Sequence, residues 1–171
     1  KMKPKIAVIL AGCGNVDGSE IRESILTLLE LERQGLEAEC FAPNLNQSQV
    51  FDHLKRTVVS ETRNILVESA RIARGQVSDL TLLEPNNFTA LVIPGGAGVA
   101  KNLCNYAFEG ANAKLLPDLD RIIKLFREQK KPIAAVCIAP VLLAISLNSA
   151  HPILTLGESE NHQNLAVLNT K

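Results

Sequence analysis

The chain has 171 residues, with 18 Lys and Arg residues against 18 Asp and Glu residues, and 46% of its residues are hydrophobic. This length suffices for one domain with a core, and the balanced charge gives no reason to expect a nucleic acid or an anionic membrane as a partner. No apolar run approaches the roughly 18 residues that a membrane span needs. The short run in "KMKPKIAVILAG" is typical of a first strand rather than a signal peptide. We therefore expect a single domain over residues 1–171 that binds neither nucleic acid nor membrane.

The strands and helices are predicted from apolar runs and amphipathic periodicity, taken in chain order. Predicted strands lie at residues 5–11, 37–43, 90–96, 132–137 and 153–157. Predicted helices lie at 19–35, 60–75 and 116–131, and a further helix begins at 139. Ser19 is a favourable N-cap and Gly35 a favourable stop for the first helix, and a short hairpin is expected around "RTVVS".

This alternation predicts an α/β fold with a doubly wound, mostly parallel sheet and helices on both faces, as in flavodoxin-like proteins. Ligand sites of such folds form beyond the carboxyl ends of the strands. Three segments meet this edge in the predicted arrangement. They are the glycine-rich loop after the first strand, the Pro-Gly-Gly turn at residues 94–96, and Cys137.

The four cysteines, Cys13, Cys40, Cys104 and Cys137, lie far apart and form no CxxC pair. This spacing argues against a disulfide scaffold and against a zinc site. We expect no metal and no cofactor. We also expect a reducing compartment, namely the cytoplasm, or the mitochondrial matrix if a transit peptide has been removed.

Cys137 stands between an apolar strand and the next helix, in "KPIAAVCIAPVLLAIS" (131–146). A residue at such a turn is lifted out of the sheet with its side chain exposed, as in a nucleophile elbow. The positive end of the following helix favours the thiolate, which is the reactive form of cysteine. The alternative is a small apolar residue buried in the strand, where cysteine is common.

Backbone and carboxylate groups at the same edge could assist a thiolate. Gly95 and Gly96 allow a tight turn whose N–H groups, with that of Ile138, could hold an oxyanion. Glu20 and Glu23 lie near the start of the first helix, where a carboxylate could bond to the thiol or carry protons. Acidic residues are also favoured in first helical turns for dipole reasons alone, so neither glutamate has an assigned role on position only.

Together, these features resemble the ThiJ/PfpI superfamily, whose fold is class I glutamine amidotransferase-like. The blocks "ILAGCGNVDGSEIRESILTLL", "ETRNILVESARIARG", "PGGAGVAKNL" and "VCIAP" are similar to the ElbB-like branch, the isoprenoid-biosynthesis or sigma-cross-reacting group, and the matching blocks cover most of residues 5–147. The resemblance implies a catalytic Cys137, a partner glutamate and a homodimer. In the superfamily, the partner glutamate lies about twelve residues before the glycine that closes the first helix. Glu23 has this spacing to Gly35, so the resemblance favours Glu23, and Glu20 stays the alternative. ElbB-like proteins are longer and the segment beyond Gly157 does not match, so we expect an incomplete C-terminal part.

The resemblance also implies a weak glyoxalase-type activity on small aldehydes and dicarbonyls, such as glyoxal converted to glycolate. Hydrolytic members of the superfamily carry a histidine after the cysteine, whereas Ile138 follows here and neither His151 nor His162 fits the pattern. Because a leaving amine needs an acid to protonate it, protease or glutamine amidotransferase activity is not expected. The alternative is a non-catalytic redox or stress regulator, linked to isoprenoid biosynthesis, in which Cys137 oxidises to a sulfinate.

Two further features of the sequence could indicate a ligand site. The glycines of "GCGNVDG" are misplaced for a dinucleotide fingerprint, and the second strand ends without an acidic residue. Lys101 and Asn102, after the Pro-Gly-Gly turn, could contact a ligand or simply begin a solvated helix.

Overall fold

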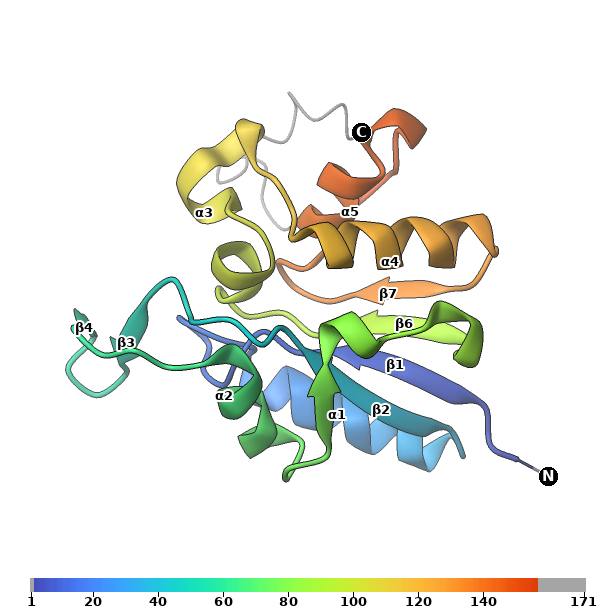
Figure 1. Ribbon diagram of the computed structural model, residues 1–171, viewed down its shortest axis with the longest axis horizontal. Coiled ribbons are helices and arrows are strands. Elements are labelled where there is room, and N and C mark those ends of the chain that lie inside the picture. The colour runs from blue at the N-terminus through green and yellow to red at the C-terminus, as the bar shows by residue number, and fades with distance from the viewer. Residues whose placement is uncertain (1, 157–171) are drawn as a thin grey trace.

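The computed structural model describes residues 2–156 and has a parallel five-stranded sheet at its centre (Figure 1). The strand order is β5-β2-β1-β6-β7, and every neighbouring pair is parallel. The strands are β1 (Lys5–Ile9), β2 (Glu37–Ala42), β5 (Val77–Asp79), β6 (Ala90–Ile93) and β7 (Ile133–Ala135). The predicted doubly wound parallel sheet is therefore confirmed.

Helices cover both faces of this sheet (Figure 1). The α-helices are α1 (Ile21–Arg33), α2 (Ile65–Ile72), α3 (Tyr106–Glu109), α4 (Pro117–Glu128) and α5 (Pro140–Ser146). Because successive strand residues point to opposite faces, Val8 and Leu10 pack in the core with α1 and α2. Ala7 and Ile9 pack in the larger core with α4 and α5. Within residues 2–156, no helix is both long enough and apolar enough to cross a membrane.

Shorter elements fill the connections. The predicted hairpin is present as β3 (Val50–Asp52) and β4 (Thr57–Val59), which projects from the body of the molecule (Figure 1). A π-helix (Val99–Leu103) follows the loop after β6. Four 3-10 turns span Leu80–Leu82, Pro85–Asn87, Gly110–Asn112 and Asn148–Ala150.

The start of α1 differs from the prediction. Its N-cap is Glu20, whose side chain accepts the N–H of Glu23. Ser19 is fully buried instead, and its hydroxyl accepts the N–H of Ala11 at 2.8 Å. This hydrogen bond ties the residue before α1 to the loop that follows β1. The Ser19 hydroxyl is therefore not available to cap α1.

Other helix and strand boundaries also differ from the prediction. The predicted helix at 60–75 begins only at Ile65, because the Asn64 side chain caps it by accepting the N–H of Val67 at 3.0 Å. β5 was not predicted, since "VSD" is too short and polar to read as a strand. Residues 153–156 of the expected last strand have no regular structure, and Gly157 lies outside the described residues.

Candidate functional site

Cys137 occupies a left-handed turn after β7. Its φ is +58°, a conformation that a residue with a side chain adopts at a cost of about 1–3 kcal/mol. The turn is closed by a hydrogen bond from the N–H of Ala139 to the carbonyl of Val136 at 2.9 Å, and α5 begins at Pro140. The residue is exposed. The structure thus rules out the buried-strand alternative and presents the thiol as an elbow would.

The other three cysteines are poor nucleophiles. Burial raises the pKa values of Cys40 and Cys104 to about 11, and it raises the pKa of Cys13, which is half-buried. Because only the thiolate is reactive, these thiols stay inert near neutral pH. Cys137 is therefore the one exposed thiol of the chain.

Glu23 lies beside Cys137, with Gly95 between them. Oε2 of Glu23 accepts the N–H of Gly95 at 2.9 Å. A β-carbon built on Gly95 would lie 2.5 Å from Cβ of Cys137 and 2.5 Å from Oε2 of Glu23. Residue 95 therefore has no room for a side chain, and this lack of a side chain lets the carboxylate approach the cysteine.

Glu20 has a different environment at the same edge. Its Oε2 accepts the N–H of Glu23 at 2.8 Å, and its Oε1 lies 3.3 Å from Nε of Arg22. The hydrogen bond from Glu23 is the main reason why the pKa of Glu20 is lowered, with Arg22 adding to it. Both oxygens of Glu20 are thus engaged, Oε2 as the helix cap and Oε1 with Arg22. By contrast, Oε1 of Glu23 has no hydrogen bond to any residue of the 2–156 range.

Not all of the backbone N–H groups expected to hold an oxyanion are free to do so. The N–H of Gly95 is used by Glu23, so it holds the carboxylate instead of facing an oxyanion. The N–H groups of Gly96 and Ile138 have no acceptor within the part of the chain that the structure describes. These two remain as the candidate oxyanion donors.

Gly96 lets two loops pack backbone against backbone. Its φ is +106°, and a β-carbon there would collide with the N of Glu20 and lie 2.5 Å from the carbonyl oxygen of Gly18. Two hydrogen bonds join the same loops, from Glu20 N–H to the Gly95 carbonyl at 2.9 Å and from Gly98 N–H to the Gly18 carbonyl at 3.0 Å. The loop after β1 and the turn after β6 therefore form one unit, which fixes α1 and its glutamates against the turn.

A cavity of about 410 Å³ opens beside the thiol. Six residues that shape it are Asn15, Glu20, Gly96, Tyr106, Cys137 and Ile138. Asn15 and Tyr106 were not singled out from the sequence, because neither residue type indicates a role at its position. The volume is in the range of pockets that hold small-molecule ligands.

No protein-family model matches the chain. The human protein named glutamine amidotransferase-like class 1 domain-containing protein 3, mitochondrial, is 43% identical over 157 residues, which are 91% of this chain and 58% of that protein. The crystal structure of an isoprenoid biosynthesis protein with an amidotransferase-like domain from Ehrlichia chaffeensis is 47% identical, with a TM-score of 0.88 over 97% of this chain and 77% of that one. The chain belongs to this amidotransferase-like family.

A more distant structure agrees on the fold alone. The ThiJ/PfpI domain protein from Brachyspira murdochii is 13% identical, with a TM-score of 0.58 over 99% of this chain and 79% of that chain. The predicted class I glutamine amidotransferase-like family is confirmed by the human and Ehrlichia relatives, and the Brachyspira structure shows that the fold is that of ThiJ/PfpI proteins. This chain spans little more than half of the human protein's length.

Among the described residues, no histidine lines the Cys137 cavity. His53 lies just after β3, and His151 follows the last 3-10 turn; neither lines the Cys137 cavity. His162 lies outside the described residues. Within residues 2–156, no three His, Cys, Asp or Glu side chains are grouped so as to hold a metal ion.

Lys101 and Asn102 brace the loop after β1. Asn102 is buried, and its amide donates to the carbonyls of Ala11 and Asp17, both at 2.9 Å. Its Oδ1 accepts the N–H of Ser48 at 3.1 Å, and Nζ of Lys101 donates to the carbonyl of Val16 at 2.9 Å. Asn102 is therefore a structural residue and not the start of a solvated helix.

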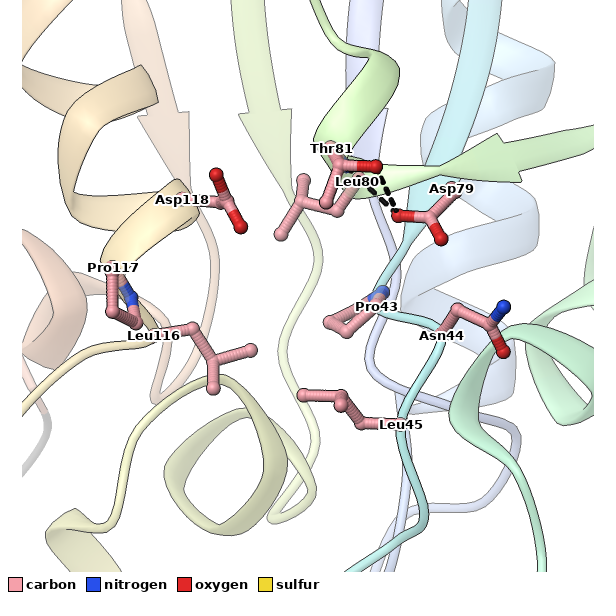
Figure 2. Close-up of a pocket in the computed structure, with 9 residues that line it drawn as sticks. All are labelled: Pro43, Asn44, Leu45, Asp79, Leu80, Thr81, Leu116, Pro117 and Asp118. Carbon is pink, nitrogen blue, oxygen red and sulfur yellow. Dashed lines mark hydrogen bonds between the residues drawn. The ribbon is translucent and has the colours of Figure 1, made fainter.

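A second cavity, of about 150 Å³, lies beyond the ends of β2 and β5 (Figure 2). Its Asp79 carboxylate is turned to Thr81, accepting the backbone N–H at 2.9 Å and the hydroxyl at 2.8 Å (Figure 2). Pro43, Leu80 and Leu116 make much of the remaining wall. A second carboxylate in the wall, Asp118, lies 4.0 Å from Nε of Arg121. With no cysteine in its wall, this cavity lacks the chemistry of the Cys137 site.

Proposed function

We propose that this ThiJ/PfpI domain is a glyoxalase-type enzyme that converts small dicarbonyls, such as glyoxal, to hydroxy acids, such as glycolate, without a cofactor. One observation carries the proposal. The exposed Cys137 sits in a left-handed elbow, and the Gly95 N–H holds the carboxylate of Glu23 beside it.

The first step forms a carbon–sulfur bond. The thiolate of Cys137 adds to one aldehyde carbon of glyoxal, and the carbonyl oxygen takes up a proton to give a hemithioacetal. The free N–H groups of Gly96 and Ile138 support this step, because donors preorganised around a developing oxyanion lower the barrier.

The second step is an internal redox change that needs no external oxidant. Glu23 removes the proton from the carbon bound to sulfur while the neighbouring aldehyde oxygen takes up a proton, which gives an enediol. Glu23 then returns its proton to the neighbouring carbon as the hydroxyl on the carbon bound to sulfur loses its own proton. One carbon is thereby oxidised to a thioester while the other is reduced to an alcohol. Water then cleaves the thioester, which releases glycolic acid and the thiol. A carboxylate is suited to carrying a proton over this short path.

Amide hydrolysis is a weaker candidate for this site. A leaving amine must be protonated by a positioned acid, usually histidine, and neither described histidine lines the cavity. The reaction proposed here expels no amine from the substrate. The names of the amidotransferase-like relatives therefore describe their fold better than they predict the chemistry of this chain.

The second candidate function is a redox or stress regulator linked to isoprenoid biosynthesis. It is favoured by the exposure of Cys137 and by the inertness of the other three thiols, since oxidation selects an accessible thiol. The related Ehrlichia structure, named an isoprenoid biosynthesis protein, supports the metabolic link.

We also propose a homodimer in a reducing compartment. The outer face of α1 exposes Ile21, Ile25 and Leu29, whose exposed fractions are 46%, 44% and 48%, and a second copy could cover them. The compartment is the cytoplasm or the mitochondrial matrix, and the name of the human relative supports the matrix. Light scattering of the purified chain would test the dimer.

Kinetics of matched variants test the enzyme proposal. Glyoxal turnover is expected to fall at least about 100-fold in Cys137→Ala and in Glu23→Gln, while Cys13→Ser retains it. Wild-type turnover no higher than that of Cys137→Ala would refute the enzyme proposal. If peroxide then oxidised Cys137 selectively in the wild type, the regulator would be the better account.

A further inference from the structure

Asp17 is a buried carboxylate with one oxygen unused. Its side chain is 6% exposed and lies in the loop after β1. Oδ2 accepts the N–H of Phe51, in strand β3, at 2.8 Å. Oδ1 is the only buried side-chain polar atom in residues 2–156 without a hydrogen bond. An unsatisfied buried acceptor costs about 1–3 kcal/mol and needs an explanation.

The imidazole of His53 faces this oxygen. Nδ1 of His53 lies 3.0 Å from the carbonyl oxygen of Phe51. A carbonyl oxygen only accepts, so Nδ1 carries the hydrogen, and Nε2 of the neutral ring then carries a lone pair. Nε2 lies 3.8 Å from Oδ1 of Asp17. Two acceptors therefore face each other, and one added proton between them would turn a repulsive contact into a charge-assisted hydrogen bond.

We propose that Asp17 and His53 form a proton-binding site, and that uptake of this proton fastens the β3–β4 hairpin to the glycine-rich loop after β1. His53 is 41% exposed, so a proton can reach it from solvent. With both ring nitrogens protonated, His53 donates to Phe51 and to Asp17 together. The proposal does not depend on the proposed enzyme activity.

The other acidic groups near His53 are already paired with cationic side chains, so Asp17 is the carboxylate that His53 can bind. In the hairpin, Asp52 accepts the N–H groups of Leu54 and Lys55 at 3.0 and 2.9 Å, and its Oδ2 lies 3.7 Å from Nζ of Lys55. In α2, the Glu68 carboxylate lies 3.0 Å from Nε of Arg71.

Three further groups complete the surroundings. Arg63 lies 3.8 Å from Glu68, and Lys101 bonds to the carbonyl of Val16. Burial raises the pKa of Cys13, so its thiol stays neutral. Every nearby acid except Asp17 thus has a cationic partner within 4 Å.

The contact between His53 and Asp17 joins the β3–β4 hairpin to the glycine-rich loop after β1. A β-carbon on Gly14 would lie 2.6 Å from Oδ1 of Asp17 and 2.8 Å from Cε1 of His53, so the ring lies directly on the loop backbone. The next residue, Asn15, lines the Cys137 cavity. Protonation would therefore stiffen a loop that shapes the candidate site.

Hydrogen exchange of the Phe51 amide tests the proposal, because this N–H donates to Asp17. Its protection factor, corrected for the intrinsic pH dependence of exchange, is expected to rise at least about fivefold between pH 8 and pH 5.5, because the added proton completes the contact between His53 and Asp17. In His53→Gln it stays constant within about twofold, because glutamine takes up no proton. His151→Gln is the matched control and keeps the wild-type profile.

Two results would overturn the proposal. One is a Phe51 protection factor in the wild type that does not change with pH. The other is the same pH-dependent rise in His53→Gln, which would assign the proton to another group. Asp17→Asn gives a second check, since the uncharged amide should abolish at least half of the rise while the amides of β1 stay protected.

Discussion

Exposure separates the four thiols at the scale of single residues. Cys137 is exposed, whereas Cys40 and Cys104 are buried with pKa values of about 11. With iodoacetamide at pH 8, Cys137 should be alkylated at least about 100 times faster than either buried thiol, because only accessible thiolate reacts. Peptide mass spectrometry at timed points measures the rates. Comparable rates for Cys40 and Cys137 in the folded protein would contradict the described burial.

Gly95 is predicted to be intolerant of any side chain. In Gly95→Ala the new methyl would collide with Cβ of Cys137 and with Oε2 of Glu23, so glyoxal turnover should fall at least about 100-fold, since small displacements of catalytic groups have effects of this size. The control is Gly35→Ala, because Gly35 also ends a tight turn but has no atom within 4 Å of the added carbon. That variant should keep turnover and lose about 1 kcal/mol of stability to its positive φ. Equal turnover in both variants would contradict the packing around Gly95.

Some of these residue-level details could be predicted from the sequence. The apolar run on both sides of Cys137 indicated the elbow, and its exposure is now observed. The role of Gly95 was not predictable, because its N–H bonds to a carboxylate 72 positions away. Local sequence carries the turn propensity of a glycine but not the identity of the group that a fold brings to it.

The π-helix at Val99–Leu103 is the element that ties the loops together. Asn102→Ala should lower the free energy of unfolding by about 2–4 kcal/mol, because the buried carbonyls of Ala11 and Asp17 lose their donor. Asn87→Ala, at an exposed position, should change it by less than about 0.5 kcal/mol. Urea denaturation followed by circular dichroism measures both. A loss below about 1 kcal/mol in Asn102→Ala would show that the loops hold without this clamp.

At the same scale, long periodic elements were predictable and short ones were not. α1 and α4 carry apolar residues at helical spacing and end near the positions expected. β5 has only three residues, and it becomes a strand because β2 offers it a partner. The π-helix likewise depends on Asn102 reaching two loops, which no local periodicity encodes.

The stability of the whole molecule should fall in alkali. Both buried thiols have folded pKa values of about 11 against a reference value of 9.0. A raised folded pKa favours the protonated form, so its contribution is complete below pH 9 and is lost as the pH rises through 11. Each thiol should cost roughly 2–3 kcal/mol over this range.

Urea titrations between pH 8 and pH 11 measure this effect. The double variant Cys40→Ala, Cys104→Ala removes both thiols and should lose clearly less stability over the same range than the wild type. Identical pH profiles for the two proteins would contradict the assignment to these cysteines.

For the molecule as a whole, the fold class was accessible from the sequence because apolar strand segments and amphipathic helix segments alternate along the chain. That Cys137, the Gly95–Gly96 turn and the start of the first helix share one edge also followed from the rule that parallel strands share one carboxyl edge. The preference for Glu23 over Glu20 came from the family resemblance. The spacing of the cysteine, the turn and the helix start did not follow, because it is set by backbone packing of Gly96 against the loop that ends at Glu20.

The most direct test of the central claim is the product formed from carbon-13 glyoxal, followed by NMR with wild-type protein and Cys137→Ala. We predict that the wild type yields labelled glycolate and that the variant yields only the background amount. Labelled glycolate at equal rates in both samples, or no glycolate above background in either, would contradict a Cys137-dependent glyoxalase.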